Sequence, residues 1–260
     1  MRHIVFSSIG IVLRVNFLMF KSLHCIALRT VRYSDRHNIV TVYSHEQGRV
    51  SLLVSAGRSR EASRQRALTM PMSLFECVAD VKPGRDILSM REVRQSMPLH
   101  DIYSHPVKVA VAMFLAEVLG VILRESQEDS MLFSYIAHAT GVLDAADDMT
   151  TANFPVAFMY GLGRFTGIEP DMSTYAPGRV FDMVDGVFRV SLPLHRDFLE
   201  GDDAAAVYVL SRMNWENIRH FRFNRVQRRR ILEVVMRYYT LHYASLSSVN
   251  SIAVLKELFD

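Results

Sequence analysis

Arginines are the residues of this chain whose type and spacing most clearly predict a chemical role. A guanidinium group binds a phosphate through paired hydrogen bonds, so arginines on one side of a domain can follow a nucleic-acid backbone without reading its sequence. The segment GRSREASRQR and the apolar segments before it are rich in them. The candidates for phosphate contact there are Arg29, Arg32, Arg36, Arg49, Arg58, Arg60, Arg64 and Arg66. The alternative is a solvated polar loop whose arginines are incidental.

A second arginine cluster precedes a long helical pattern near the C-terminus. Positive charge at the start of a helix is disfavoured by the helix dipole, which favours an external anionic partner. Alternatively, the arginines are the solvated start of a helix that packs elsewhere. We count Arg228 and Arg229 from this cluster among the candidate DNA contacts; the full cluster is Arg219, Arg222, Arg225, Arg228, Arg229 and Arg230.

Candidate catalytic groups are fewer. Asp144, Asp147 and Asp148 could hold a metal ion, which makes a metal-dependent nuclease one alternative, but a solvated acidic helix end explains them more simply. The segment GLGRFTG, residues 161–167, follows no strand and lacks the spacing of a phosphate-binding loop. His100 and His105 have no acidic ligand at metal-site spacing. We therefore predict a protein that is not an enzyme and that has no metal site.

Charge is distributed unevenly along the 260 residues. The net charge of +3 divides into +8 over residues 1–100, −10 over 101–204 and +5 over 205–260. A basic first segment beside an acidic middle indicates nucleic-acid binding together with a second role. With 50% apolar and 22% charged residues, the chain can bury a core, which excludes disordered, collagen-like and multispan membrane proteins.

The two cysteines and the N-terminus give further expectations. Cys25 and Cys77 are too few for a disulfide framework, so we expect buried thiols in a reducing cytosol. Arg14 and Asn16 interrupt the apolar start of the chain, which is too short to span a bilayer. We interpret residues 1–18 as an extension or a mis-assigned start and predict no membrane contact.

Short strands predict the architecture of residues 19–100. Val50, Leu52 and Val54 alternate with polar residues, and Gln47-Gly48 supplies a turn before them. Tyr33 and Tyr43 either stack on bases or belong to the core. Five strands in this length are typical of an OB-fold barrel, although SH3-like barrels share the number. The expected strands are 23–33, 37–44, 49–56, 72–79 and 86–95.

Residues 101–260 change to a helical period. The expected helices start at Pro106, near a Ser126–Asp129 capping box and at Asn153, and later ones cover 204–215, 225–247 and 251–259. Asp185-Gly186 between apolar runs predicts a β-hairpin near 180–190. The predicted fold class is thus α+β: an N-terminal five-stranded OB-fold barrel, then an all-α helical domain with a small β-hairpin insertion.

An ordered set of segments carries a family resemblance from about Met19 to Phe259. The segments are ALRTVRYSDRHNIVTVYSHEQGRVSLLVSAGRSR, KVAVAMFLAEVLGVILRE, LFSYIAHATGVLD, NFPVAFMYGLGRFTGIEP, FDMVDGVFRVSLPLH, RRRILEVVMRYYTLHYASL and SIAVLKELF. Together they resemble the RecO family of bacterial DNA repair and recombination mediators, particularly its form in Bacteroides-like bacteria. No single segment is a specific motif, but the order of the whole set is specific.

The resemblance implies a non-enzymatic protein of the cytoplasm and nucleoid that acts in the RecF pathway. Such proteins bind single- and double-stranded DNA and anneal complementary strands. With RecR they help RecA displace single-strand binding protein (SSB). Many relatives hold zinc through four cysteines between the third helix and the hairpin. Residues 168–190 contain no cysteine, so we expect no zinc or other cofactor.

The resemblance also implies a receptor for the acidic, apolar-ended C-terminal tail of SSB, which should combine an apolar pocket with a cation. Lys108 and Arg124 are the only lysine or arginine residues between 101 and 163, and they bracket a helix carrying Met113 and Phe114. They are therefore the candidates for tail contact. The remaining alternative is a general OB-fold module that binds RNA and uses the helical part as a scaffold.

Overall fold

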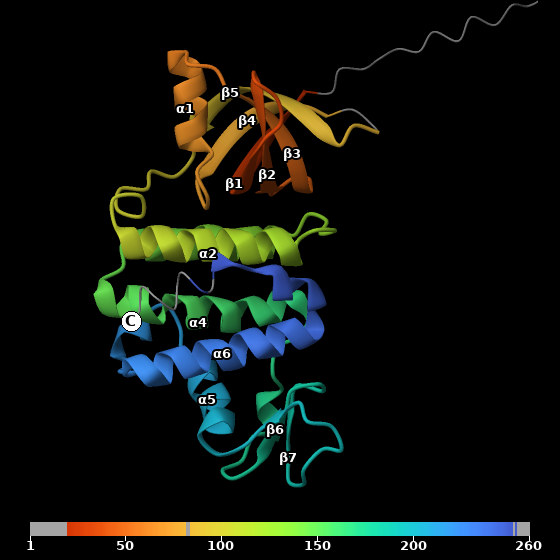
Figure 1. Ribbon diagram of the computed structural model, residues 1–260, viewed down its shortest axis with the longest axis vertical. Helices are drawn as coiled ribbons and strands as arrows, with labels where there is room; N and C mark the ends of the chain where they lie inside the picture. The colour runs from red at the N-terminus through yellow and green to blue at the C-terminus, as the bar shows by residue number, and fades with distance from the viewer. Residues whose placement is uncertain (1–19, 82–83, 252, 254–260) are drawn as a thin grey trace, which may run out of the picture.

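A five-stranded closed barrel forms the first half of the molecule (Figure 1). The computed structural model describes residues 20–81, 84–251 and 253. The strand order around the barrel is β1-β2-β3-β5-β4; only β3 and β5 pair in parallel, with Leu52 opposite Leu88. All five predicted strands and the OB-fold are confirmed. Their bounds are Phe20–Arg32 for β1, His37–Ser44 for β2, Gly48–Ser55 for β3, Leu74–Asp80 for β4 and Ile87–Gln95 for β5.

A helix that the sequence did not predict closes one end of the barrel. Helix α1, Arg60–Leu68, lies between β3 and β4 within the arginine-rich segment. The Ser59 hydroxyl accepts a hydrogen bond from the Ala62 N–H (3.1 Å), which caps the first turn. Ala62 is buried, and Leu68 packs against the interior of the barrel. Ser59 could have indicated the start of this helix from the sequence. The helix was not predicted because its run of charged residues has no strong apolar face.

Alternate residues of each strand point into the barrel, as the period of two requires. Cys25 and Cys77 lie in this interior core, as expected for small apolar residues. On the outer face, Ile26 and Tyr43 join the core of the helical domain. The turn at Gly48 has a φ of +62°, and a Cβ there would lie 2.5 Å from the backbone of Gln127. Glycine is therefore required where the barrel meets the helices.

Stacked helices form most of the second half, with α2 against the barrel, α4 beneath it and α6 farther away (Figure 1). The predicted capping box at Ser126 is wrong, because Asp129 caps α3 by accepting the N–H groups of Met131 and Leu132. The start at Asn153 is also wrong: Asp147 caps α4, and Pro155 lies inside it. The bounds are Pro106–Ile122 for α2, Ser130–Asp144 for α3, Asp148–Thr166 for α4, Gly201–Ser211 for α5 and Arg225–His242 for α6.

A small three-stranded sheet lies at the far end of the helical domain. Strands β6, Val180–Asp182, and β7, Val187–Arg189, form the predicted hairpin, and an unpredicted third strand, β8, Phe198–Leu199, pairs with β6. The hairpin loop has four residues, 183–186, rather than the two-residue Asp185-Gly186 turn. Gly186 has a φ of +68°, and a Cβ there would lie 2.9 Å from the Tyr238 hydroxyl.

The remaining predictions concern the two ends of the chain and the membrane. The segment 1–18 lies outside the described residues, and so does most of the helix expected over 251–259. After α6, residues Ala244–Ser248 form a 3-10 turn rather than the predicted end of a longer helix. None of the helices in the described part is long and apolar enough to cross a membrane.

Candidate nucleic-acid interface

Four of the predicted arginines gather beside the end of the barrel that carries α1. Arg32 is the last residue of β1 and Arg36 lies in the turn before β2, while the segment from β3 into α1 contains Arg58 and Arg60. A hydrogen bond from the Ala56 N–H to the Arg36 carbonyl (2.9 Å) joins the two segments. All four arginines are exposed. Together with Tyr33 of the same turn they form a basic patch, which we call the hairpin surface.

Charge compensation on the hairpin surface is slight. Arg32 contacts Asp35 at 2.6 Å, but both side chains are largely exposed, so the pair contributes little energy and can exchange for a phosphate. Among the described residues, no ion pair involves Arg36, Arg58 or Arg60. The hairpin surface therefore presents guanidinium groups that are free to bind phosphate.

Two candidate arginines in α1 instead attach that helix to the barrel. Arg64 donates through Nη2 to the Val93 carbonyl (2.9 Å), and Arg66 donates through Nη1 to the Gly57 carbonyl (2.6 Å). These bonds occupy part of each guanidinium. The two residues position the hairpin surface, and they are less available to DNA than their neighbours in sequence.

The two candidate tyrosines differ in their exposure to solvent. Tyr33 is 63% exposed, whereas Tyr43 is fully buried. The Tyr43 hydroxyl donates to the Gln127 carbonyl (3.2 Å) and accepts the Asp129 N–H (3.1 Å), and burial raises its pKa. Tyr43 therefore belongs to the junction between barrel and helices, and only Tyr33 can stack on a base.

Replacing Tyr33 by alanine is expected to weaken single-stranded DNA binding while leaving the fold intact. Loss of a stacked base costs about 1–3 kcal/mol, which is about 5- to 150-fold in Kd. Fluorescence anisotropy with a labelled oligonucleotide measures the change. Tyr33→Phe keeps the ring and should bind as the unchanged protein does; an equal loss in both variants would contradict stacking.

A second basic site lies at the other end of the barrel. Here a cavity of about 590 Å³ is bordered by Lys21, Arg49, Arg85 and Arg124. We call it the barrel mouth. The sequence indicated Arg49 and Arg124 for different partners, and it missed Lys21 and Arg85, which reach the site only because the barrel closes. Arg49 donates through Nη1 to the Arg124 carbonyl (2.8 Å).

Arg29 is the remaining candidate on the barrel. It is exposed on β1, and its positive charge lowers the pKa of Glu117 in α2. Burial alone raises the pKa of Glu117, but hydrogen bonds from Ser251 and Asn250 and the charge of Arg29 outweigh it, so the pKa is lowered. Arg29 thus lies between the two domains and has an acidic neighbour.

The late arginine cluster is separated from the barrel, because α2 and α4 lie between the barrel and α6 (Figure 1). Arg228 is half-buried: it donates through Nε to Asn153 (3.3 Å) and through Nη2 to the Phe223 carbonyl (3.1 Å), and burial lowers its pKa. Arg229 is exposed and lies 3.4 Å from Glu233. Arg228 therefore supports the helical core, and the cluster does not extend the hairpin surface.

Lys108 is not a surface cation, contrary to its selection as a candidate for tail contact. It is 3% exposed, and its Nζ donates to Asp101 (2.6 Å) and to the Asp144 carbonyl (2.8 Å). An ammonium group leaves water only when such partners replace its hydration. Lys108 therefore holds the connection between the domains to the helices, while Arg124 remains exposed at the barrel mouth.

Lys108→Glu is expected to destabilise the fold by about 3 kcal/mol, because it leaves a buried carboxylate beside Asp101. Thermal unfolding measures this as a lower Tm. The matched variant Arg124→Glu replaces an exposed cation and should change the free energy of unfolding by less than about 0.5 kcal/mol. Equal stability of the two variants would contradict the structural role of Lys108.

The three aspartates considered for a nuclease have structural partners. Asp144 accepts the backbone N–H groups of residues 100–102 at 2.8–2.9 Å. Asp147 caps α4 by accepting the Thr150 N–H (2.7 Å), and Asp148 is exposed in its first turn. Within the described residues, no group of three or more His, Cys, Asp or Glu side chains could hold a metal ion.

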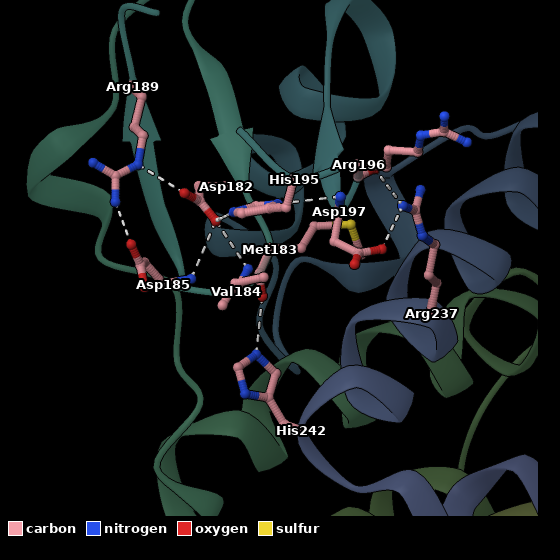
Figure 2. Close-up of polar contacts among 10 residues, drawn as sticks. All are labelled: Asp182, Met183, Val184, Asp185, Arg189, His195, Arg196, Asp197, Arg237 and His242. Carbon is pink, nitrogen blue, oxygen red and sulfur yellow. Dashed lines mark hydrogen bonds and ion pairs between the residues drawn. The ribbon is translucent and has the colours of Figure 1, made fainter. Parts of the chain in front are cut away.

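A buried carboxylate organises the small sheet (Figure 2). Asp182 is 1% exposed; its Oδ2 accepts Arg189 Nε (2.7 Å), and its Oδ1 accepts the N–H groups of Val184 (3.0 Å) and Asp185 (3.2 Å). His195 lies 3.2 Å from Oδ1 through Nε2. Because His195 Nδ1 accepts the Asp197 N–H, the ring proton lies on Nε2 and is donated to Asp182.

These contacts determine the charge state of Asp182. Burial alone raises its pKa, but Arg189, the two backbone N–H groups and His195 outweigh burial, and the pKa is lowered. Asp182 therefore stays ionised and ties the hairpin to the loop before β8. The sequence signal was an aspartate at the start of a turn, which commonly accepts N–H groups two and three residues later.

Two family models match the chain in the same order as these two structural halves. Residues 19–97 match the family described as Recombination protein O N terminal, and residues 103–248 match Recombination protein O C terminal. The chain belongs to the RecO family. It is 38% identical over 234 residues to the DNA repair protein RecO of Phocaeicola vulgatus, covering 90% of this chain and 97% of that protein.

Other RecO proteins give the same result. The DNA repair protein RecO of Bacteroides fragilis is 37% identical over 236 residues, and that of Porphyromonas gingivalis is 31% identical over 240 residues. Each alignment covers 90% of this chain and 97% of the relative. The resemblance seen in the ordered segments is confirmed, and the barrel and helices belong to a RecO DNA repair protein.

Proposed function

We propose that this protein is a recombination mediator of the RecF pathway, which binds single- and double-stranded DNA and anneals complementary strands without acting as an enzyme. The observation that carries the proposal is the hairpin surface, where four exposed arginines and an exposed tyrosine lie on an OB-fold barrel in a RecO family chain. Arginine neutralises phosphate repulsion between two strands and leaves their bases free to pair.

The proposed partners follow from the family. With RecR, the protein helps RecA replace SSB on single-stranded DNA in the cytoplasm and nucleoid. Contact with the acidic SSB tail requires an exposed cation, so Lys108, which is 3% exposed, is not proposed for it.

Annealing of complementary oligonucleotides tests the function directly. One strand carries a fluorophore and the other a quencher, and both are coated with intact SSB or with tail-deleted SSB. We expect acceleration by this protein with intact SSB and less with the tail-deleted form. No acceleration on bare or coated strands would contradict the proposal, and tighter binding of an RNA than of the same DNA sequence would favour the RNA-binding alternative. Cleavage of DNA in the presence of Mg²⁺ or Mn²⁺ would contradict a non-enzymatic role.

We further propose that the small sheet is stable without zinc. The residues present do not fit the ion: residues 168–200 contain no cysteine, and the Asp182 oxygens already accept Arg189, His195 and two backbone N–H groups. Zinc sites of structural type need four ligands, commonly including cysteine.

Removal of metal is therefore expected to leave the protein unchanged. Thermal unfolding in excess EDTA should give the same Tm as in buffer, and elemental analysis of the purified protein should find less than one zinc per chain. A lower Tm in EDTA that zinc restores would show that the region does bind metal.

A further inference from the structure

The barrel mouth has the composition of an anion-binding site. Strand β3 starts there, and it ends at the opposite end of the barrel, which α1 covers. Val50 and Leu88 give the cavity an apolar floor, and among the described residues four cations border it, against one carboxylate, Asp86. Its volume of about 590 Å³ lies within the range of about 300–1,000 Å³ that is common for small-molecule sites.

Arg49 and Arg124 are the two cations of the barrel mouth whose charge is least compensated. Arg49 donates one N–H to the Arg124 carbonyl, but its Nε is buried and has no hydrogen-bond partner in the described part of the structure. A buried donor without a partner is destabilising, and more so when the group carries a charge. No carboxylate of the described residues lies within 4.0 Å of either guanidinium.

The two guanidinium groups also repel each other. Burial and the charge of Arg124 both lower the pKa of Arg49. Arg85 lies 3.9 Å from Asp80, so it is partly neutralised, but Lys21 adds a further positive charge. A single bound anion would relieve the repulsion and satisfy the unpartnered Nε–H.

We propose that the barrel mouth binds a phosphate group of a nucleic acid strand, with the attached nucleotide against the apolar floor. This inference rests on the proposed DNA-binding function. The cavity is blind, because Leu23 and Leu52 fill the barrel interior beyond its floor. A strand cannot pass through it, so a strand end fits best. A terminal phosphate also carries more negative charge than an internal one.

Oligonucleotides that differ only at one end test the site. Fluorescence anisotropy compares 20-residue DNA strands ending in a 5′-phosphate, a 3′-phosphate or hydroxyl groups only, each labelled at the other end. The unchanged protein is expected to bind one of the phosphorylated strands about tenfold more tightly than the hydroxyl strand, as for one added charge-assisted contact. Arg124→Glu should reduce this ratio to about one, and Arg124→Lys should retain part of it.

The matched control is Arg164→Glu, which changes an exposed arginine of α4 outside the mouth and should keep the tenfold ratio. If Arg124→Glu loses affinity equally for all three strands, the site is still supported, but its ligand is an internal phosphate. If Arg124→Glu binds every strand as tightly as the unchanged protein does, the inference is overturned. Displacement of the phosphorylated strand by an acidic peptide with an apolar end would also overturn it, because the barrel mouth would then be a site for a protein tail. If the unchanged protein binds no DNA at all, the proposed function itself fails.

Discussion

Replacing Arg36 and Arg58 together by alanine is expected to weaken single-stranded DNA binding on the order of 60-fold at 50 mM salt. Each phosphate contact contributes a slope of about −0.7 to the dependence of log affinity on log salt concentration, which corresponds to about eightfold per contact at this salt. The double variant should therefore also lower the magnitude of the salt slope by about 1.4. Anisotropy titrations from 50 to 300 mM salt measure both quantities.

The control for this prediction is a double replacement in the late cluster, Arg225→Ala with Arg229→Ala. Both residues are exposed, as Arg36 and Arg58 are, but they lie on α6, away from the barrel. We expect this variant to keep most of its affinity and its salt slope. A larger loss there than on the hairpin surface would place the DNA on the helical domain instead.

Asp182→Ala is expected to lower the free energy of unfolding by about 3 kcal/mol. The change removes the buried acceptor of two backbone N–H groups, of Arg189 Nε and of His195 Nε2. Arg189 keeps Asp185 and can be rehydrated, so most of the loss comes from the buried N–H groups left without a partner and from the emptied space. For a chain of this size the Tm should fall by about 6–12 °C. Chemical denaturation followed by circular dichroism gives the free energy.

The neighbouring Asp185→Ala provides the matched comparison. Its side chain is 54% exposed and also contacts Arg189, so its removal should cost less than about 1 kcal/mol. Similar losses in the two variants would mean that the buried position of Asp182 does not matter.

The stability from Asp182 is also expected to depend on pH. Its folded-state pKa lies below the ordinary value of about 3.9, so its contribution is complete above about pH 5. The contribution disappears as the pH falls through the lowered folded-state pKa. The difference in stability between the unchanged protein and Asp182→Ala should therefore be largest near neutral pH and shrink below pH 4. A difference that grows with acidity would contradict this assignment.

Local patterns in the sequence predicted most of the secondary structure. Strand alternation around Val50 and the helical period after Pro106 depend on neighbouring residues only, and both elements formed as expected. The errors occurred where two local signals competed. Asn153-Phe-Pro155 suggested a helix start, but Asp147 provided a better cap six residues earlier. Helix α1 was missed because its few apolar residues are recognisable only when the open end of a barrel lies over them.

Position in space decided the rest of the candidate site. Arg36 and Arg58 are 22 residues apart in sequence, and they share a surface because β2 and β3 pair through their whole length. Lys108 and Arg124 looked equivalent in sequence, but α2 turns one inward to Asp101 and leaves the other at the barrel mouth. The sequence by itself determined the family, the order of barrel and helices, and an excess of arginine. Only the tertiary structure decided which arginines are exposed and which charges meet, because burial and contacts between distant segments follow from barrel closure and helix packing rather than from residue type.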